Sequence, residues 1–260
     1  MITAYLAHLA FDGKRPNTIE VRRKVLGSVD RRVAPLDELT KTQALEWLAG
    51  YASPQTRASY LAHLRSFYAW ATREDLLTVN PVADIRTPKV PRRVPRPMPE
   101  TALREAVGAA VGQQRAWLVL SAYVGLRGCE IAPMRGEHVL RGAVPTLYIP
   151  EQKGGGEGYA SLPAIVLDEL DRWPRRGRLW DVTADQISAR SARFLRGLGL
   201  DVTLHQGRHR FGTQVYRASG HDLRMTQEAL RHLSPASTAI YTAVDPAETA
   251  AVLNRLPGVA

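Results

Sequence analysis

Three histidines, an arginine and a tyrosine toward the carboxyl end of the chain have the types and spacing needed for phosphoryl transfer. His205, Arg208 and His209 fall on one predicted helix face, because residues three and four positions apart lie on the same side of a helix. His232 follows on a predicted loop, and Tyr241 comes nine residues later. Together these five side chains would suit phosphoryl transfer through a covalent bond to tyrosine.

Two other interpretations of these residues must be weighed. Tyr241 alone is a weak indication, because the chain holds nine tyrosines and most tyrosines are core or surface aromatics. His205 and His209 have a spacing that can bind zinc on a helix. The adjacent Arg208 and the lack of a clear carboxylate or thiol as third ligand argue against zinc. We therefore expect no metal site here.

The overall charge indicates a polyanionic partner. The 260 residues include 35 Lys and Arg against 25 Asp and Glu, a formal net charge of +10. Such an excess most often indicates nucleic acid, although a basic protein from an arginine-rich proteome is the alternative.

Cysteine usage and hydropathy give the expected compartment. Cys129 is the single cysteine, which excludes an internal disulfide and a Cys-based zinc site, and we expect it to be a small buried apolar residue. The amino terminus lacks the features of a signal peptide, and no apolar run approaches the roughly 18 residues that span a bilayer. We expect a soluble, cytoplasmic protein with no membrane partner.

The first third of the chain is predicted to be helical. Helices are expected over 2–10, from a cap at 17–18 to 26, from a cap at 40 to 48, and from 54 to 73. The last of these carries Arg57, Arg65 and Arg73 opposite its apolar face. A charged face is usually only solvated, but a basic one could lie along DNA phosphates.

Residues 80–99 are dense in proline and cations and predict an extended linker. A basic linker could follow a DNA backbone, and a merely solvated spacer is the alternative. Its candidate DNA contacts are Lys89, Arg92, Arg93 and Arg96.

The remainder predicts a mixed domain, so the fold class is mainly α with a small β-sheet or hairpin. Strands are expected over 146–150 and 159–163, joined by a glycine-rich turn. Helices are expected near 100–111, 113–124, 127–134, 164–172, 184–197, 205–218, 222–231, 235–243 and 246–255.

The carboxyl-terminal pattern resembles the signature of the tyrosine recombinase/integrase family. His-x-x-Arg-His, then Leu-x-His with Ser-x-x-Ser-Thr, then Tyr, match it at His205, Arg208, His232 and Tyr241. The segment AYVGLRGCEIAPMRGEHV resembles the family's first arginine box, with Arg127 as the catalytic arginine and Glu130 as its acidic companion. The segment QKGGGEGYASLP resembles its Gly-Lys-Gly turn. The resemblance covers nearly the whole chain.

Lys153, in that turn, has support from the residues themselves. It is the only lysine after Lys89. A lysine ammonium can give up a proton, whereas arginine is effectively always charged. An ordinary surface lysine is the alternative.

The resemblance implies a role for each matched residue. Tyr241 would attack a DNA phosphodiester, leaving a 3′-phosphotyrosyl bond and a 5′-hydroxyl, without ATP, metal or cofactor. Arg127, Arg208 and His232 would bind the phosphate. Lys153 would protonate the departing 5′-oxygen, and His205 would assist proton removal from the tyrosine, with His209 in support. Glu130 would orient its neighbours.

The resemblance also implies the domain layout and partners. We expect a helical core-DNA-binding domain over 1–86, a basic linker over 87–99, and a catalytic domain over 100–260 that ends in a helix. The two domains would form a C-shaped clamp on double-stranded DNA. Four subunits would join in a synaptic tetramer, with an accessory directionality factor as a further partner.

The chain departs from the family pattern at two positions. Arg231 stands where the family usually has glycine, which we expect to alter the helix exit or add a phosphate contact. Val124 stands where threonine is frequent.

The subtype stays open. Integration or excision of a phage or mobile element is favoured over dimer resolution of the Xer type, although the chain begins directly at the core-binding domain, as dimer resolvases do. A non-catalytic DNA clamp and a type IB topoisomerase are more distant alternatives.

Overall fold

The computed structural model describes residues 1–91, 96–150, 156–231 and 238. The chain divides into two compact units, Met1–Arg92 and Arg93–Ala260. Each unit has a hydrophobic core of its own.

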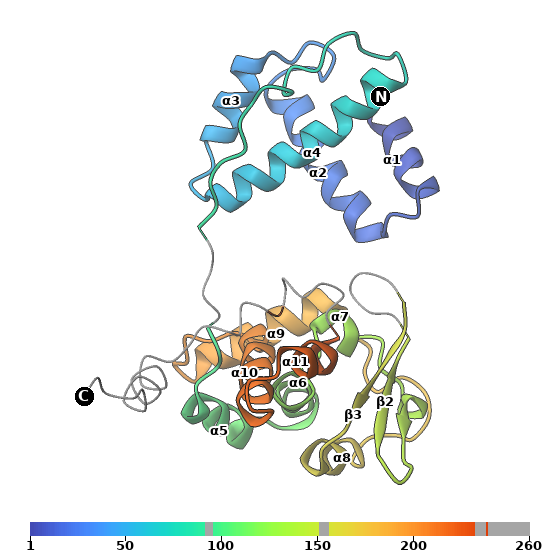
Figure 1. Cartoon of the computed structure of the whole chain (residues 1–260), viewed down its shortest axis with the longest axis vertical. Helices are drawn as coiled ribbons and strands as arrows, with labels where there is room; N and C mark the ends of the chain where they lie inside the picture. The colour runs from blue at the N-terminus through green and yellow to red at the C-terminus, as the bar shows by residue number, and fades with distance from the viewer. Residues whose placement is uncertain (92–95, 151–155, 232–237, 239–260) are drawn as a thin grey trace, which may run out of the picture. The chain divides into compact units, whose positions relative to one another are not determined.

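The described part of the first unit is helical, and its last helix contacts the other three (Figure 1). Proline starts two of the helices, since its fixed φ suits the first helical position and the missing N–H is not needed there. Thr40 caps another, and its side chain accepts a hydrogen bond from the backbone N–H of Gln43 at 3.3 Å. The helices are α1 (Ile2–Phe11), α2 (Pro16–Arg32), α3 (Lys41–Ala49) and α4 (Pro54–Arg73).

The chain after α4 stays packed on this unit before it reaches residue 92. Val82 and Ile85 are buried in the core of the unit. Arg65, on α4, donates hydrogen bonds from its guanidinium to the carbonyl of Ile85 and, at 2.8 Å, to the hydroxyl of Thr87. The first part of the proline-rich segment is therefore fixed to α4.

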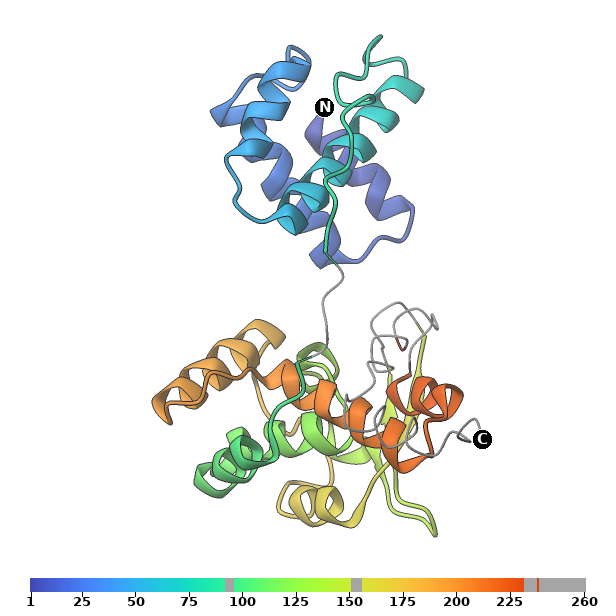
Figure 2. The same cartoon turned by 60° about the vertical axis from the view of Figure 1, so that its left-hand side comes forward.

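The second unit is built around α6, which lies among the other helices of the unit (Figure 2). Seven consecutive residues of this helix are buried. It contacts α5, α7, α8, α9 and α10. A helix that is apolar on nearly every side needs such a complete cover. The helices described here are α5 (Glu100–Ala109), α6 (Gly112–Tyr123), α7 (Gly128–Ile131), α8 (Ala164–Leu170), α9 (Ala184–Gly197), α10 (Leu204–Ala218) and α11 (Leu223–Leu230), with a 3-10 turn at Gly136–His138.

A three-stranded antiparallel sheet lies at one edge of this unit, with α8 beside it in Figure 1. Its strands are β1 (Val139–Leu140), β2 (Thr146–Ile149) and β3 (Gly158–Ser161), in the order β1-β2-β3. The β2–β3 register pairs Thr146 with Ser161 and Ile149 with Gly158. Leu147, Ile149 and Ala160 turn toward the core, because successive side chains alternate between the two faces of a strand.

Helices α6 and α10 pack closely through a glycine and a serine. A Cβ added at Gly207 would lie 3.0 Å from the Ser121 hydroxyl oxygen. That hydroxyl donates a 2.8 Å hydrogen bond to the carbonyl of Leu204, at the start of α10. The contact sets the depth at which the first turn of α10 lies against the core.

The predicted fold class, mainly helical with a small sheet, is confirmed. Several boundaries differ. Helix α2 begins at Pro16 and continues to Arg32, beyond the predicted end at 26, because Val25, Leu26 and Val29 keep a buried stripe in register. Strand β1 was not predicted, since two residues carry no readable alternation. The predicted helices over 235–243 and 246–255 lie outside the described residues. No helix in the described ranges is long and apolar enough to cross a bilayer.

Candidate active site

The turn between α6 and α7 is shaped by a glycine and closed by a glutamate. Gly125 has φ +67°, and a Cβ there would lie 2.4 Å from the ring of Phe211. No other residue therefore fits at this position without displacing that ring. Glu130 accepts a 2.9 Å hydrogen bond from the backbone N–H of Arg127 and a second, also 2.9 Å, from its guanidinium. The carboxylate thereby caps α7 and aims the arginine side chain.

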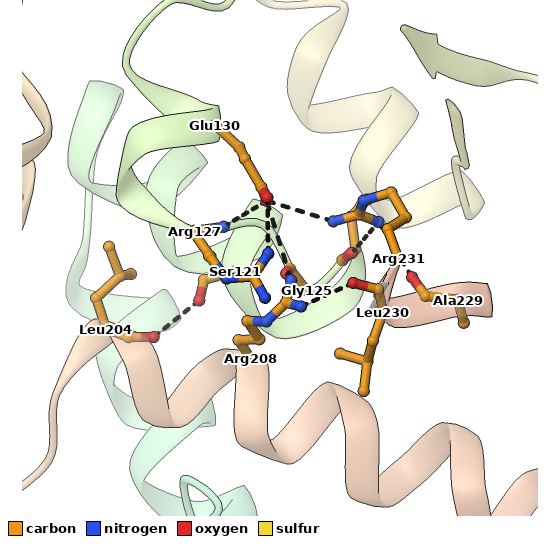
Figure 3. A network of polar contacts seen from close by, with 10 residues as sticks. Ser121, Gly125, Arg127, Glu130, Leu204, Arg208, Ala229, Leu230 and Arg231 are labelled. Atoms are coloured by element: carbon orange, nitrogen blue, oxygen red, sulfur yellow. Dashed lines mark hydrogen bonds and ion pairs between the residues drawn. The ribbon is translucent and has the colours of Figure 1, made fainter. Parts of the chain in front are cut away.

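Arg208 reaches the same carboxylate from α10. Its side chain is 2% exposed, and its Nη1 lies 3.9 Å from Glu130 Oε2. The guanidinium also donates to the carbonyl of Gly125 and, at 2.7 Å, to that of Leu230 (Figure 3). It therefore joins the turn before α7 to the end of α11.

Arg231 is a third guanidinium on Glu130. Its Nη2 lies 3.4 Å from Glu130 Oε2, and its side chain is 5% exposed. Its Nη1 donates to the carbonyls of Val124 at 3.3 Å and Ala229 at 3.1 Å. Its backbone has φ 55° and ψ 45°, the left-handed conformation that glycine favours at helix ends. The substitution for glycine therefore does not prevent a left-handed helix exit, and the side chain turns inward to Glu130 (Figure 3).

The cluster leaves an excess of positive charge. Burial works to raise the pKa of the Glu130 carboxyl, but the Arg127 backbone N–H and the charges of Arg231, Arg208 and Arg127 outweigh it. The pKa of Glu130 is consequently below its usual value, and the group is ionised near neutral pH. One carboxylate faces three guanidiniums, an arrangement that favours an additional anion.

The two histidines of α10 lie beside this cluster. His205 is exposed and His209 is half-buried, with ring centroids 4.8 Å apart. Burial, and then the charge of Arg208, lowers the pKa of His209. His209 is therefore neutral at neutral pH.

Helix α10 also holds the end of the proline-rich segment. The backbone N–H of Met98 donates to the Gln206 carbonyl at 3.0 Å. Arg210 makes a bidentate ion pair with Glu100, with nitrogen–oxygen distances of 2.6 and 3.0 Å. The chain entering the second unit is thus fixed to the helix that carries His205 and Arg208.

The remaining predicted catalytic residues, Lys153, His232 and Tyr241, lie outside the described residues. The structure brings Arg208 to Arg127 and Glu130, although Arg208 lies about eighty positions further along the sequence. On the hairpin, the hydroxyl of Tyr148 donates a 2.6 Å hydrogen bond to Glu157, close to the turn that contains Lys153.

The candidate DNA-binding cations have varied surroundings. Arg65 is hydrogen bonded within the first unit as described above, while Arg73 pairs with Glu74 at 3.3 Å and lies 3.1 Å from a ring nitrogen of His8. Arg57 is half-buried, and its Nε has no hydrogen-bond partner among the described residues. Lys89 and Arg96 are exposed, whereas Arg92 and Arg93 lie outside the described residues.

Two observations bear on the remaining predictions. Cys129 is exposed, so the expected burial is wrong: it is the second residue of the short helix α7, whose inward positions are taken by Glu130 and Ile131. Within the described ranges no group of three His, Cys, Asp or Glu side chains could hold a metal ion. Gly125 and Ser121 were not predicted as parts of the site, because their hydrogen-bond partners lie 83 positions away in the sequence.

Comparisons with known proteins identify the family. No protein-family model matches the chain. Tyrosine recombinase XerC of Methylobacterium nodulans is 30% identical over 272 residues, which is 94% of this chain and 80% of that protein. The integrase of mycobacterium phage Brujita is 27% identical, with a TM-score of 0.50, over 99% of this chain and 92% of that one. A lambda integrase tetramer bound to a Holliday junction shares the fold, with a TM-score of 0.72 at 19% identity over 95% of this chain and 79% of that one.

The chain belongs to the tyrosine recombinase family. It is an enzyme of DNA strand exchange, as the sequence resemblance predicted.

Proposed function

We propose that this recombinase cuts and rejoins DNA at specific sites through a 3′-phosphotyrosyl bond to Tyr241, and that it integrates or excises a phage or mobile element. The observation that carries the first part is the convergence of Arg127 and Arg208 on the buried carboxylate of Glu130. Fixed guanidiniums stabilise the charge on the non-bridging oxygens of a phosphoryl transition state without a metal.

In the proposed cleavage step the Tyr241 oxygen forms a bond to phosphorus while the bond from phosphorus to the 5′-oxygen breaks. The tyrosine proton passes to His205, since a phenol of pKa near ~10 is a poor nucleophile unaided. Lys153 gives a proton to the departing 5′-oxygen, and His232 donates a hydrogen bond to the phosphate. Religation is the reverse attack by a 5′-hydroxyl of the partner strand.

A nicked suicide substrate tests the nucleophile. The native chain should form a covalent protein–DNA complex, and Tyr241→Phe should form none. Tyr216→Phe, on α10, is the matched control and should retain the complex. A covalent complex with Tyr241→Phe, or none with the native chain, contradicts the proposal.

A modified substrate tests Lys153 separately. Lys153→Ala should slow cleavage of normal DNA by about 10² to 10⁴-fold, the usual range for loss of a general acid. A bridging 5′-sulfur leaves without protonation, so the same variant should cleave that substrate at nearly the native rate. Equal losses on both substrates would show that Lys153 does not act as the acid.

We extend the proposal to DNA binding. The helical unit would act as a core-DNA-binding domain, the proline-rich segment as a basic linker, and the second unit as the catalytic domain of a clamp. Support comes from the net charge of +10 and from the fold shared with lambda integrase bound to DNA. Lys89 and Arg96 are the described linker cations that remain exposed. A homotetramer on paired sites follows from the same likeness.

Integration and dimer resolution differ in their sites. The likeness to the phage Brujita integrase, which extends over 99% of this chain, supports integration. The relatives named XerC support resolution of the Xer type as the second candidate. Two plasmids with unlike attachment sites, taken from the element and its host, should recombine if the chain is an integrase. Recombination only between identical sites would favour a resolvase.

A further inference from the structure

Arg231 occupies a backbone conformation that works against its own residue type. Its φ of 55° lies in the left-handed region, where a Cβ is crowded and glycine is the usual residue. A non-glycine residue persists there when its surroundings fix it in place. The surroundings of Arg231 are the members of the candidate active site.

The side chain connects three separate segments. Nη2 lies 3.4 Å from Glu130, on α7. Nη1 donates to the carbonyl of Val124, in the turn after α6, and to that of Ala229, in the last turn of α11. The guanidinium thereby closes the end of α11 onto the same turn that Arg208 reaches through the Gly125 carbonyl.

The position of Arg231 in the chain makes these contacts consequential. The residue that follows Arg231 in the sequence is His232, one of the proposed catalytic residues. The carbonyl of Leu230, immediately before Arg231, accepts a 2.7 Å hydrogen bond from Arg208. Two arginines therefore hold the end of α11. Arg208 bonds to the backbone of the helix, and Arg231 fixes the helix end through its own side chain.

We propose that Arg231 is a positioning residue for strand cleavage: its guanidinium holds the end of α11 in register with Glu130, Arg127 and Arg208. The inference rests on the proposed function of those residues. The buried guanidinium has its two terminal nitrogens engaged by protein groups, so its role here is to orient the phosphate-binding groups.

Glycine is the informative replacement. Arg231→Gly removes the guanidinium and keeps a residue that adopts the left-handed conformation readily, so the backbone path can be retained. Arg231→Lys keeps the charge next to Glu130 but has all its donors on one nitrogen, so it loses the fork with which Nη1 reaches the two carbonyls and Nη2 reaches Glu130. Arg224→Ala is the control, an arginine on the same helix that is 86% exposed and pairs with Glu228.

The measurement is the rate constant for single-turnover cleavage of the nicked suicide substrate, with the full-length protein in saturating excess over the DNA. Arg231→Gly should lower the rate constant about tenfold to a hundredfold, the range expected when reacting groups shift by up to an ångström. The Kd for DNA should stay within about twofold, because the phosphate-binding groups remain. Arg231→Lys should recover part of the rate, and Arg224→Ala should match the native chain.

The rate constant separates positioning from folding. A purely structural role would lower the melting temperature and the amplitude of cleavage, while the rate constant of the active molecules stayed native. That result, or native kinetics in Arg231→Gly, overturns the inference. In a Glu130→Gln background Arg231→Gly should have a much smaller further effect, because the two act through one contact. If the native chain itself forms no covalent complex, the proposed function fails instead.

Discussion

The two units of this recombinase bury different kinds of side chain. The core of the first unit is aliphatic and aromatic, with Tyr5, Phe67 and Trp70 in mutual ring contact. Every polar or charged residue that is buried among the described residues belongs to the second unit, and the list is Ser121, Glu130, Glu169, Ser191, Arg208, Thr226 and Thr238. The first unit keeps its many cations at or near the surface.

This difference follows from what each unit must hold in place. Apolar burial is non-directional, so it stabilises a helix bundle without fixing individual polar atoms. A phosphate-binding site needs guanidiniums whose nitrogens are fixed before DNA arrives, and fixing them requires partners inside the protein. Glu130 supplies those partners for three arginines at once. The second unit therefore depends on one buried carboxylate in a way that the first does not.

Removal of that carboxylate should give the largest effect. Glu130→Gln leaves three guanidiniums without a counter-charge, and breaking a buried ion pair costs about 3–5 kcal/mol. Hydrogen exchange resolved by segment should show the second unit opening more readily while α1–α4 keep their native protection. Glu228→Gln is the control: its side chain is 66% exposed, and its loss should stay within about 0.5 kcal/mol. A loss below about 1 kcal/mol for Glu130→Gln would contradict the dependence on this carboxylate.

Two glycines offer the next comparison, one in each unit. Gly13 has φ +70° with no atom within 4 Å of an added Cβ, whereas Gly125 has φ +67° with the Phe211 ring 2.4 Å away. Gly13→Ala should cost only the backbone strain, about 1–2 kcal/mol. Gly125→Ala should cost about 2–4 kcal/mol, since the ring must also move.

Urea unfolding gives the two costs. Gly125→Ala should also slow DNA cleavage, because the Gly125 carbonyl holds Arg208. Equal stability losses at the two glycines would show that the second unit accommodates the extra methyl group as easily as open solvent does.

The same contrast explains what could be predicted from sequence. Helix α4 could be predicted closely, because Ser53 and Pro54 mark its start and an apolar stripe runs through Leu61, Leu64 and Phe67. The pairing of Arg127 with Glu130 is local, only three positions apart, and the resemblance to the family supplied Arg208. The role of Arg231 could not be predicted, because its partners lie 101 and 107 positions away and depend on the packing of α11. Local periodicity carries no information about contacts of that kind.

The smallest expected effect concerns a matched pair of histidines. His63 and His209 are both half-buried. In each, burial and then a neighbouring arginine, Arg22 or Arg208, lowers the pKa below the usual 6.5. An unfolded chain then binds protons that the folded chain does not. The contribution of each to stability is fully present above pH 6.5 and is lost as the pH falls from there through the lowered pKa.

Stability should therefore fall modestly between pH 7.5 and 5.5, with a contribution from each histidine. His63→Gln should flatten this dependence in the first unit and His209→Gln in the second, as read by segment-resolved hydrogen exchange at the two pH values. Because the arginine next to His209 belongs to the Glu130 cluster, Glu130→Gln should also steepen the second unit's pH dependence by leaving Arg208 less neutralised. If stability of the second unit depends on pH equally in the native protein and in Glu130→Gln, the positive charge around His209 is not set by that cluster.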